Sequence, residues 1–136
     1  MFENLDQIDW NYLGFPQLAD WIRGLISDNP DLRIKYHSAI VNSYIHENAK
    51  AMRTIVPFML TILEKKEVNT ETGILIEQLR AFFFYAIDFI ERNTSIDDAQ
   101  DIISKIRNSK NIFEVLSKHP LTQETALRIL NDIEVI

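Results

Sequence analysis

Cysteine is absent from this chain of 136 residues, and glycine and proline are scarce, with three and four copies. Without a thiol the protein has no disulfide, no thiolate metal site and no cysteine nucleophile. The absence of cysteine also favours a reducing compartment. The length is typical of one domain, which we place at residues 1–136, and a domain of this size buries enough surface to form a core without cross-links.

Basic residues are the minority among the charged ones, with 14 Lys and Arg against 20 Asp and Glu and a formal net charge of −6. An acidic chain repels nucleic-acid phosphates, so no nucleic-acid partner is expected. The charge is uneven, because residues 1–32 contain one basic and six acidic residues, a local charge of −5. A protein partner with a basic face is therefore expected to approach the N-terminal end.

No segment has the pattern of a secretion signal or a membrane span. The N-terminus carries Glu3 and Asp6 where a signal peptide would be positively charged, and no apolar stretch follows. The most apolar stretch, residues 73–90, contains one arginine and two acids, each costing about 2.5–3.5 kcal/mol at a bilayer centre. We therefore expect a cytoplasmic protein without a membrane partner.

The spacing of apolar residues predicts helices and no strands, so we expect an all-α protein of seven helices. Each proline lies near an expected helix boundary or kink, as in helices joined by short turns. The predicted helices are 16–27, 30–47, 49–66, 70–92, one from 95 through 106, 112–118, and one that Thr122 caps. The helix at 70–92 is apolar over more than half its circumference and is expected at the centre of the fold.

Two helix boundaries carry specific expectations. Pro57 lies inside the third predicted helix, where it removes a backbone donor and crowds the preceding turn, so a kink or restart is expected near Thr54. Ser95, with Asp98 three residues later, has the spacing of a capping box for the fifth helix.

Seven helices joined by short turns fit either a compact bundle or a short right-handed helical solenoid. Turn motifs at residues 28–33, 56–58 and 119–120 divide the chain into about three antiparallel helix pairs, close to the length of HEAT units, about 40–47 residues. This spacing favours the solenoid, and the compact bundle is the alternative.

Two short motifs stand out in the first half of the chain. The turn at 28–33 reads Asp-Asn-Pro-Asp-Leu-Arg, and residues 56–58 read Val-Pro-Phe at the expected start of the next helix pair. With these motifs the first half of the chain resembles bacterial HEAT-repeat proteins. Residues 115–127 more weakly resemble one unit of the leucine-rich variant repeat, also a helical solenoid. The resemblance implies a partner-binding scaffold, with toxin-neutralising or regulatory roles among bacterial relatives, and it supplies no catalytic residue. Tyr36 and His37 depart from the family, which places small alanines there.

No common catalytic motif is present: the chain lacks Gly-x-Ser-x-Gly, a glycine-rich phosphate loop and His-Glu-x-x-His. His37 and His46 would face opposite sides of one helix and cannot share a metal, and His46 is expected to be solvated. The acids between Asp97 and Asp101 lie at the start of a predicted helix, where negative charge complements the helix dipole. His119 lies at the end of another predicted helix, where a histidine also complements the dipole. We expect no catalytic residue, no cofactor, no metal and hence no enzyme.

The second predicted helix carries the most informative surface. Arg33, Tyr36, His37, Tyr44 and Glu47 fall within about 100° of its circumference. Tyrosine and arginine are enriched at interface hot spots, so this face is the first candidate for partner contact. The alternative is that the two tyrosines line the core. The short turn also predicts that Arg33 pairs locally, with Asp28 or Asp31 and helix carbonyls.

Two further groups of aromatic residues have structural and functional interpretations. Phe84 shares a charged stripe of its helix, so it either packs on a neighbouring helix pair or contacts a partner. Trp10, Tyr12 and Phe15 are expected to cap the end of the core rather than to anchor a partner.

These observations predict a non-enzymatic protein–protein interaction module with an acidic, aromatic-bearing surface. Its partner-binding residues are predicted to be Arg33, Tyr36, His37, Tyr44, Glu47 and Phe84. A toxin or a nucleic-acid-binding protein would fit as the basic partner, and a second copy of the chain is a further candidate.

The alternative is a small-ligand-binding protein or an enzyme that holds an anionic or aromatic molecule in a groove. That groove would lie near Arg33, Tyr36, His37 and Tyr44. A pocket of a few hundred cubic ångströms, with converging polar groups and a perturbed His37, would favour this alternative.

Overall fold

The computed structural model describes residues 2–135, which form seven α-helices, two short 3-10 segments and no strand. The α-helices are α1 (Leu18–Gly24), α2 (Pro30–Val41), α3 (Ala49–Lys65), α4 (Thr72–Glu91), α5 (Ile96–Asn108), α6 (Lys110–Leu116) and α7 (Gln123–Val135). The 3-10 segments are Leu5–Gln7 and Ile45–Glu47. The prediction of an all-α protein with seven helices is confirmed. None of the helices within residues 2–135 has both the length and the apolarity required to cross a bilayer.

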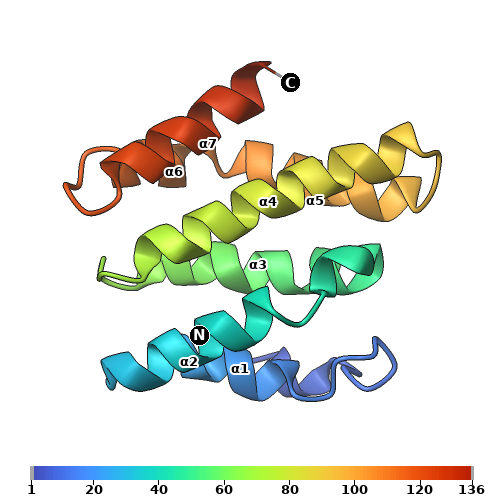
Figure 1. Ribbon diagram of the computed structural model, residues 1–136, viewed down its shortest axis with the longest axis horizontal. Helices are drawn as coiled ribbons and strands as arrows, with labels where there is room; N and C mark the ends of the chain where they lie inside the picture. The colour runs from blue at the N-terminus through green and yellow to red at the C-terminus, as the bar shows by residue number, and fades with distance from the viewer. Residues whose placement is uncertain (1, 136) are drawn as a thin grey trace.

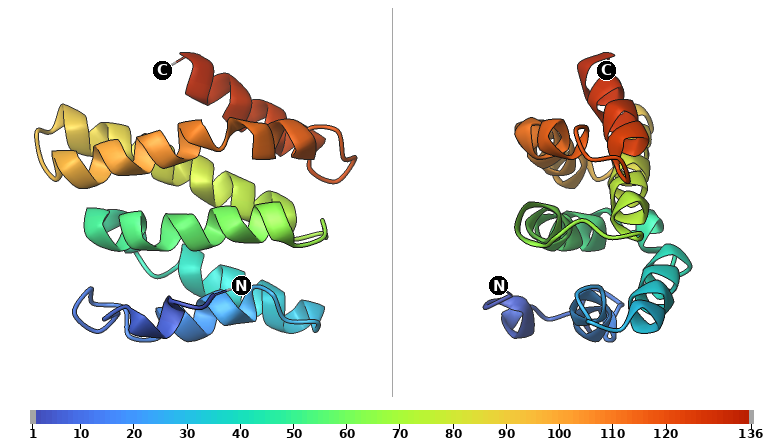
Figure 2. Two further views of the ribbon diagram at one scale, coloured as in Figure 1. Left: turned by 180° about the vertical axis from the view of Figure 1, so that it is seen from behind. Right: turned by 90° about the vertical axis from the view of Figure 1, so that its left-hand side faces the viewer.

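The helices are stacked in chain order in two layers (Figures 1 and 2). One layer contains α1, α3 and the α5–α6 segment, and the other contains α2, α4 and α7, as the right-hand view of Figure 2 shows. The N-terminal segment runs beside α1 at one end of the stack, and α7 lies at the other end.

Helix α4 is central, as its composition predicts. It contacts α2, α3, α5 and α7. Its core-facing residues Leu79, Phe82 and Phe83 are completely buried. Each such side chain contributes roughly 1.5–3 kcal/mol when it leaves water, so the face of α4 is a main source of stability.

The second predicted helix ends earlier than expected, at Val41 instead of residue 47. Two polar side chains after Val41 form hydrogen bonds that compete with continuation of the helix. The Ser43 hydroxyl donates to the Ile40 carbonyl at 2.7 Å. Asn48 caps the next helix, because its side chain accepts from the Ala51 amide at 3.0 Å. Between them Tyr44 adopts a left-handed backbone conformation, with φ of 61°.

Two expected features of helix boundaries are absent from the part of the chain that the structure describes. Helix α3 runs without a break from Ala49 to Lys65 with Pro57 inside it, so of the expected kink or restart near Thr54 the restart does not occur. Most of its residues around the proline are buried, and their packing holds the helix together. Ser95 forms no capping hydrogen bond, because its left-handed backbone, with φ of 49°, directs the chain differently from a capping box.

Tyr36 is partly buried and packs between α1 and α2, which favours the alternative that its ring lines the core. Its ring lies directly on Gly24, the last residue of α1, where a methyl group would overlap the ring. The missing side chain of Gly24 thus allows α1 and α2 to approach closely. The local pattern of α2 does not reveal this contact, since it depends on a glycine in the preceding helix.

The N-terminal segment covers the core as expected, with one exception. Trp10 is buried and donates from Nε1 to the Leu5 carbonyl at 3.0 Å, and Phe15 packs against the core. Tyr12 is 79% exposed, so the expectation that it caps the core is wrong.

We predict opposite effects for alanine at two helical glycines. Gly24→Ala should lower the free energy of unfolding by about 1–3 kcal/mol, because the added methyl displaces the Tyr36 ring. Gly73→Ala is the matched control: its nearest neighbouring atom would be 3.7 Å away, so the variant should be neutral or more stable. Urea unfolding of both variants measures the difference. Equal stabilities would contradict the close contact.

Candidate functional site

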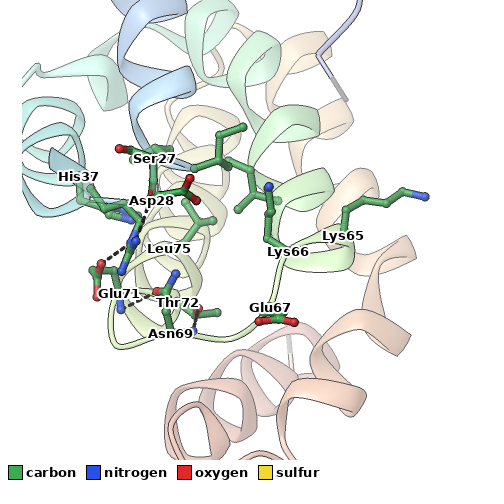
Figure 3. Close-up of a pocket in the computed structure, with 14 residues that line it drawn as sticks. Ser27, Asp28, His37, Lys65, Lys66, Glu67, Asn69, Glu71, Thr72 and Leu75 are labelled. Atoms are coloured by element: carbon green, nitrogen blue, oxygen red, sulfur yellow. Dashed lines mark hydrogen bonds and ion pairs between the residues drawn. The ribbon is translucent and has the colours of Figure 1, made fainter. Parts of the chain in front are cut away.

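A cavity of about 400 Å³ lies between the first two helix pairs (Figure 3). The end of α1 and the first half of α2 form one side, and the end of α3 and the start of α4 form the other. Its apolar lining includes Leu25, Ile62 and Leu75, all of which are buried. Arg33, His37 and other polar residues complete the wall, so the cavity combines an apolar surface with hydrogen-bonding groups.

A buried ion pair closes one side of this cavity. Arg33 of α2 donates from Nε to Oε1 of Glu71 at 2.7 Å and from Nη1 to the Ser27 carbonyl at 2.8 Å. Both charged side chains are largely withdrawn from solvent. The pairing predicted with Asp28 or Asp31 is wrong, since the fold brings Arg33 to an acid 38 positions away. The carbonyl that Arg33 contacts belongs to Ser27 in the turn after α1, not to a helix as expected.

Glu71 stays charged in spite of its burial. Burial alone would raise the pKa of its carboxyl group, but hydrogen bonds from Thr70 and Arg33, together with the positive charge of Arg33, lower the pKa below its usual value of 4.5. Oε2 accepts from the Thr70 hydroxyl, and Oε1 accepts from Arg33. The carboxylate therefore has a partner on each oxygen.

His37 is the polar residue of the wall without a protein partner. Its side chain is 7% exposed, and no group within residues 2–135 hydrogen-bonds to either ring nitrogen. Every fully buried side-chain nitrogen in that part of the chain has a partner, so the two unpartnered ring nitrogens each keep some accessible surface, and the His37 side chain lines the cavity. Burial lowers the pKa of His37 below 6.5; nearby Glu71 opposes this effect and Arg33 adds to it. The imidazole is therefore neutral near pH 7.

Two neighbouring lysines at the end of α3 differ in direction. Figure 3 shows the Lys66 side chain beside the other residues that line the cavity, whereas the Lys65 side chain extends outward. Lys65 lies 3.6 Å from Glu64, while Lys66 has no acidic partner within 4.0 Å in residues 2–135. Lys66 is thus available to a ligand at the mouth.

A second surface feature is a set of stacked aromatic rings, which we call the aromatic patch: Tyr44, His46 and Tyr85. The His46 and Tyr85 rings stack with centroids 4.5 Å apart, and the Tyr44 and His46 centroids are 6.0 Å apart. Tyr44 is 65% exposed and Tyr85 is 40% exposed. His46 was expected to be solvated, but the stacking leaves it only partly exposed.

The structure divides the six predicted partner-binding residues between different places. Arg33 and His37 line the cavity, and Tyr36 packs on α1. Tyr44 belongs to the aromatic patch, and Glu47 is exposed one residue after His46. The early end of α2 separates the two groups, because Tyr44 and Glu47 no longer share a helix with the cavity residues.

Phe84 lies on the flank of α4, one residue before Tyr85 of the patch. It is 39% exposed, and the Arg80 guanidinium lies 5.6 Å from the centre of its ring. Arg80 in turn pairs with Asp132 of α7. Phe84 therefore combines a contact to a cation with an accessible face.

Three residues that these sites use were missed by the sequence analysis: Glu71, Lys66 and Tyr85. Their positions follow from contacts between helices that are distant along the chain. No local spacing signals these contacts.

The acids at the start of α5 serve as ion-pair partners. Asp98 and Asp101 each accept from Arg53 of α3 at 3.0 Å, and Asp101 also lies 2.7 Å from Lys105. Across residues 2–135 no three His, Asp or Glu side chains gather in an arrangement that could hold a metal ion. The acids therefore connect α3 and α5.

Comparison with protein families, curated proteins and solved structures finds no match to this chain.

The buried pair predicts a strong coupling between Arg33 and Glu71. Arg33→Met and Glu71→Leu should each lower the free energy of unfolding by about 3–5 kcal/mol, because each leaves an unpaired charge in a buried position. The double variant should lose much less than the sum of the two losses. A double-mutant cycle by urea unfolding measures the coupling. Additive losses would contradict a direct interaction.

The lowered pKa of His37 predicts a loss of stability in mild acid. The folded state binds a proton less readily than the unfolded chain, whose pKa is near 6.5, so stability is complete above that pH and declines as the pH falls below it. The contribution of Glu71 is separate, because it is lost only below 4.5. Urea unfolding between about pH 7.5 and about pH 5 should show the decline.

Substitution of single histidines tests whether His37 causes the loss of stability in mild acid. His37→Gln should reduce it, whereas His119→Gln, which removes a histidine outside the cavity, should retain it. An unchanged decline in His37→Gln would show that another group is responsible.

Proposed function

We propose that this chain is a non-enzymatic protein-interaction module that binds its partner through the aromatic patch, with Glu47 and Phe84 at its edge. The observation that carries the proposal is the exposure of Tyr44, which is 65% exposed although its backbone is left-handed. Tyrosine offers a partner a large apolar area together with a polar hydroxyl. Such residues are typical interface hot spots.

The backbone of Tyr44 supports a functional role for this ring. A left-handed conformation costs a residue other than glycine roughly 1–2 kcal/mol. Burial of the ring does not offset this cost, because Tyr44 is 65% exposed. Conformational strain of this kind is concentrated at functional sites.

Acidic groups near the aromatic patch favour a partner with a basic face. Glu47 follows His46 and is exposed, and Asp88, which pairs with Arg92 at 2.9 Å, lies one helical turn after Tyr85. Glu91 is exposed two turns after Phe84. Carboxylates at the rim of an interface accelerate encounter with a basic partner, while the aromatic rings supply affinity. A toxin or a nucleic-acid-binding protein meets this description.

The stack of helices supports the further proposal of a short HEAT-like solenoid, with a compact bundle as the alternative. The two layers are occupied by alternate helices along most of the chain, as expected for successive helix pairs (Figure 2). The aromatic patch joins the turn after α2 to α4, so it spans two neighbouring elements of this arrangement. Solenoids bind partners on surfaces of this kind.

A second candidate function, the binding of a small ligand, is supported by the cavity. Its volume is about 400 Å³, Arg33 and Glu71 converge with His37 at its wall, and the pKa of His37 is lowered. Pockets of a few hundred cubic ångströms suit small molecules. The cavity and the aromatic patch involve different residues, so the two functions can be tested independently.

We predict that Tyr44→Gly combined with Tyr85→Ala weakens partner binding at least about 30-fold, as expected for the loss of a hot spot. Glycine is chosen at position 44 because it adopts φ of 61° without strain, so the fold should persist. Affinity capture from the native lysate, quantified by mass spectrometry, identifies the partner. Titration with the purified partner then gives the affinity.

Tyr12→Ala is the matched control, since Tyr12 is 79% exposed and lies outside the aromatic patch. It should bind like the wild type. The proposal fails if no stoichiometric partner is recovered, or if the double variant and Tyr12→Ala bind the partner equally.

A further inference from the structure

The groups that line the cavity can be divided into those with protein partners and those that are available. Both oxygens of Glu71 are occupied, by Arg33 and by Thr70. Arg33 uses Nε and Nη1, while Nη2 has no partner within residues 2–135 and is not sealed from solvent. The His37 ring and the Lys66 ammonium are also without partners there. All three available groups can donate hydrogen bonds.

These donors lie around an apolar surface. Leu25, Ile62 and Leu75 line the cavity and are buried, so a ligand in contact with them removes its own apolar area from water. Figure 3 places Leu75 between His37 and the side chain of Lys66. A ligand that matches this wall has an apolar body and one group that accepts hydrogen bonds from several donors.

The charges of the cavity limit the charge of that ligand. Asp28 and Glu67 lie at the mouth without ion-pair partners within 4.0 Å in the part of the chain that the structure describes. With Glu71 they balance the charges of Arg33, Lys65 and Lys66, and His37 is neutral. A multiply charged anion such as phosphate is therefore disfavoured by the acids at the mouth. A single carboxylate fits, because Arg33 and Lys66 can pair with one negative charge.

We propose that this cavity binds a small monocarboxylic acid with an apolar body. The carboxylate accepts hydrogen bonds from Nη2 of Arg33 and from His37, Lys66 supplies a facing positive charge at the mouth, and the body packs on the three buried apolar residues. The assignment rests on the second candidate function, small-ligand binding, and it specifies the chemical class of the ligand. It does not depend on the aromatic patch.

Benzoate and hexanoate are suitable probes for the full chain, with benzamide, hexanamide and inorganic phosphate as comparisons. Calorimetric titration and ligand-observed NMR give the affinities. Both acids are expected to bind, and the amides should bind at least about tenfold more weakly, because one charge-assisted contact contributes about a factor of ten. Phosphate should show no saturable binding.

The two adjacent lysines provide a matched pair of variants. Lys66→Ala should weaken the binding of benzoate about tenfold, whereas Lys65→Ala should weaken it much less, because Lys65 lines the cavity but its side chain extends outward. Both residues are exposed, so neither variant should unfold. His37→Gln tests the inner end of the cavity, and its thermal unfolding curve shows whether the protein remains folded.

The outcomes separate the two levels of the proposal. If neither acid binds the wild type at millimolar concentration, both the carboxylate assignment and the ligand-binding function are overturned. If the amides bind as tightly as the acids, or if the two lysine variants weaken binding equally, the cavity binds ligands but the carboxylate assignment is overturned. Selective loss in Lys66→Ala, with preference for the acids, supports the assignment.

Discussion

Burial of α4 between its neighbours is the constraint on which the rest of the arrangement depends. Helices α2, α3, α5 and α7 all contact it, and Phe82 and Phe83 are completely enclosed by these contacts. The same helix carries Glu71 just before its first residue and Tyr85 about 20 Å further along its axis. One buried element therefore positions both the cavity and the aromatic patch. The packing of α4 in the core thus determines where the residues of both candidate sites lie.

Much of the fold could be predicted from the sequence, because each helix shows a regular spacing of apolar residues along the chain. The central position of the helix near 70–92 follows from its apolar residues on most of its surface, and this prediction is confirmed. The errors occur where polar side chains decide a boundary. Ser43 bonds back to Ile40 after α2 has ended, and Ser95 adopts a left-handed backbone instead of capping α5. Such choices depend on backbone geometry that apolar spacing does not encode.

The candidate sites were harder to predict, since their partners are distant in the sequence. Arg33 was recognised as a residue of interest, but its partner Glu71 is 38 positions away and has no local signature. Tyr36 lies on the same predicted face as His37, yet its ring packs against a glycine of α1. The residues of one predicted surface thus lie at three places: the cavity, the contact between α1 and α2, and the aromatic patch. The residue types could be recognised in the sequence, but which of them lie together is known only from the structure.

The cavity and the aromatic patch lie on the same boundary, the one between α2 with its following turn and α4. The Arg33–Glu71 pair crosses this boundary near one end, and the His46–Tyr85 stack crosses it near the other. Two separate contacts therefore fasten α2 and its following turn to α4, an ion pair near the start of α4 and a ring stack further along it.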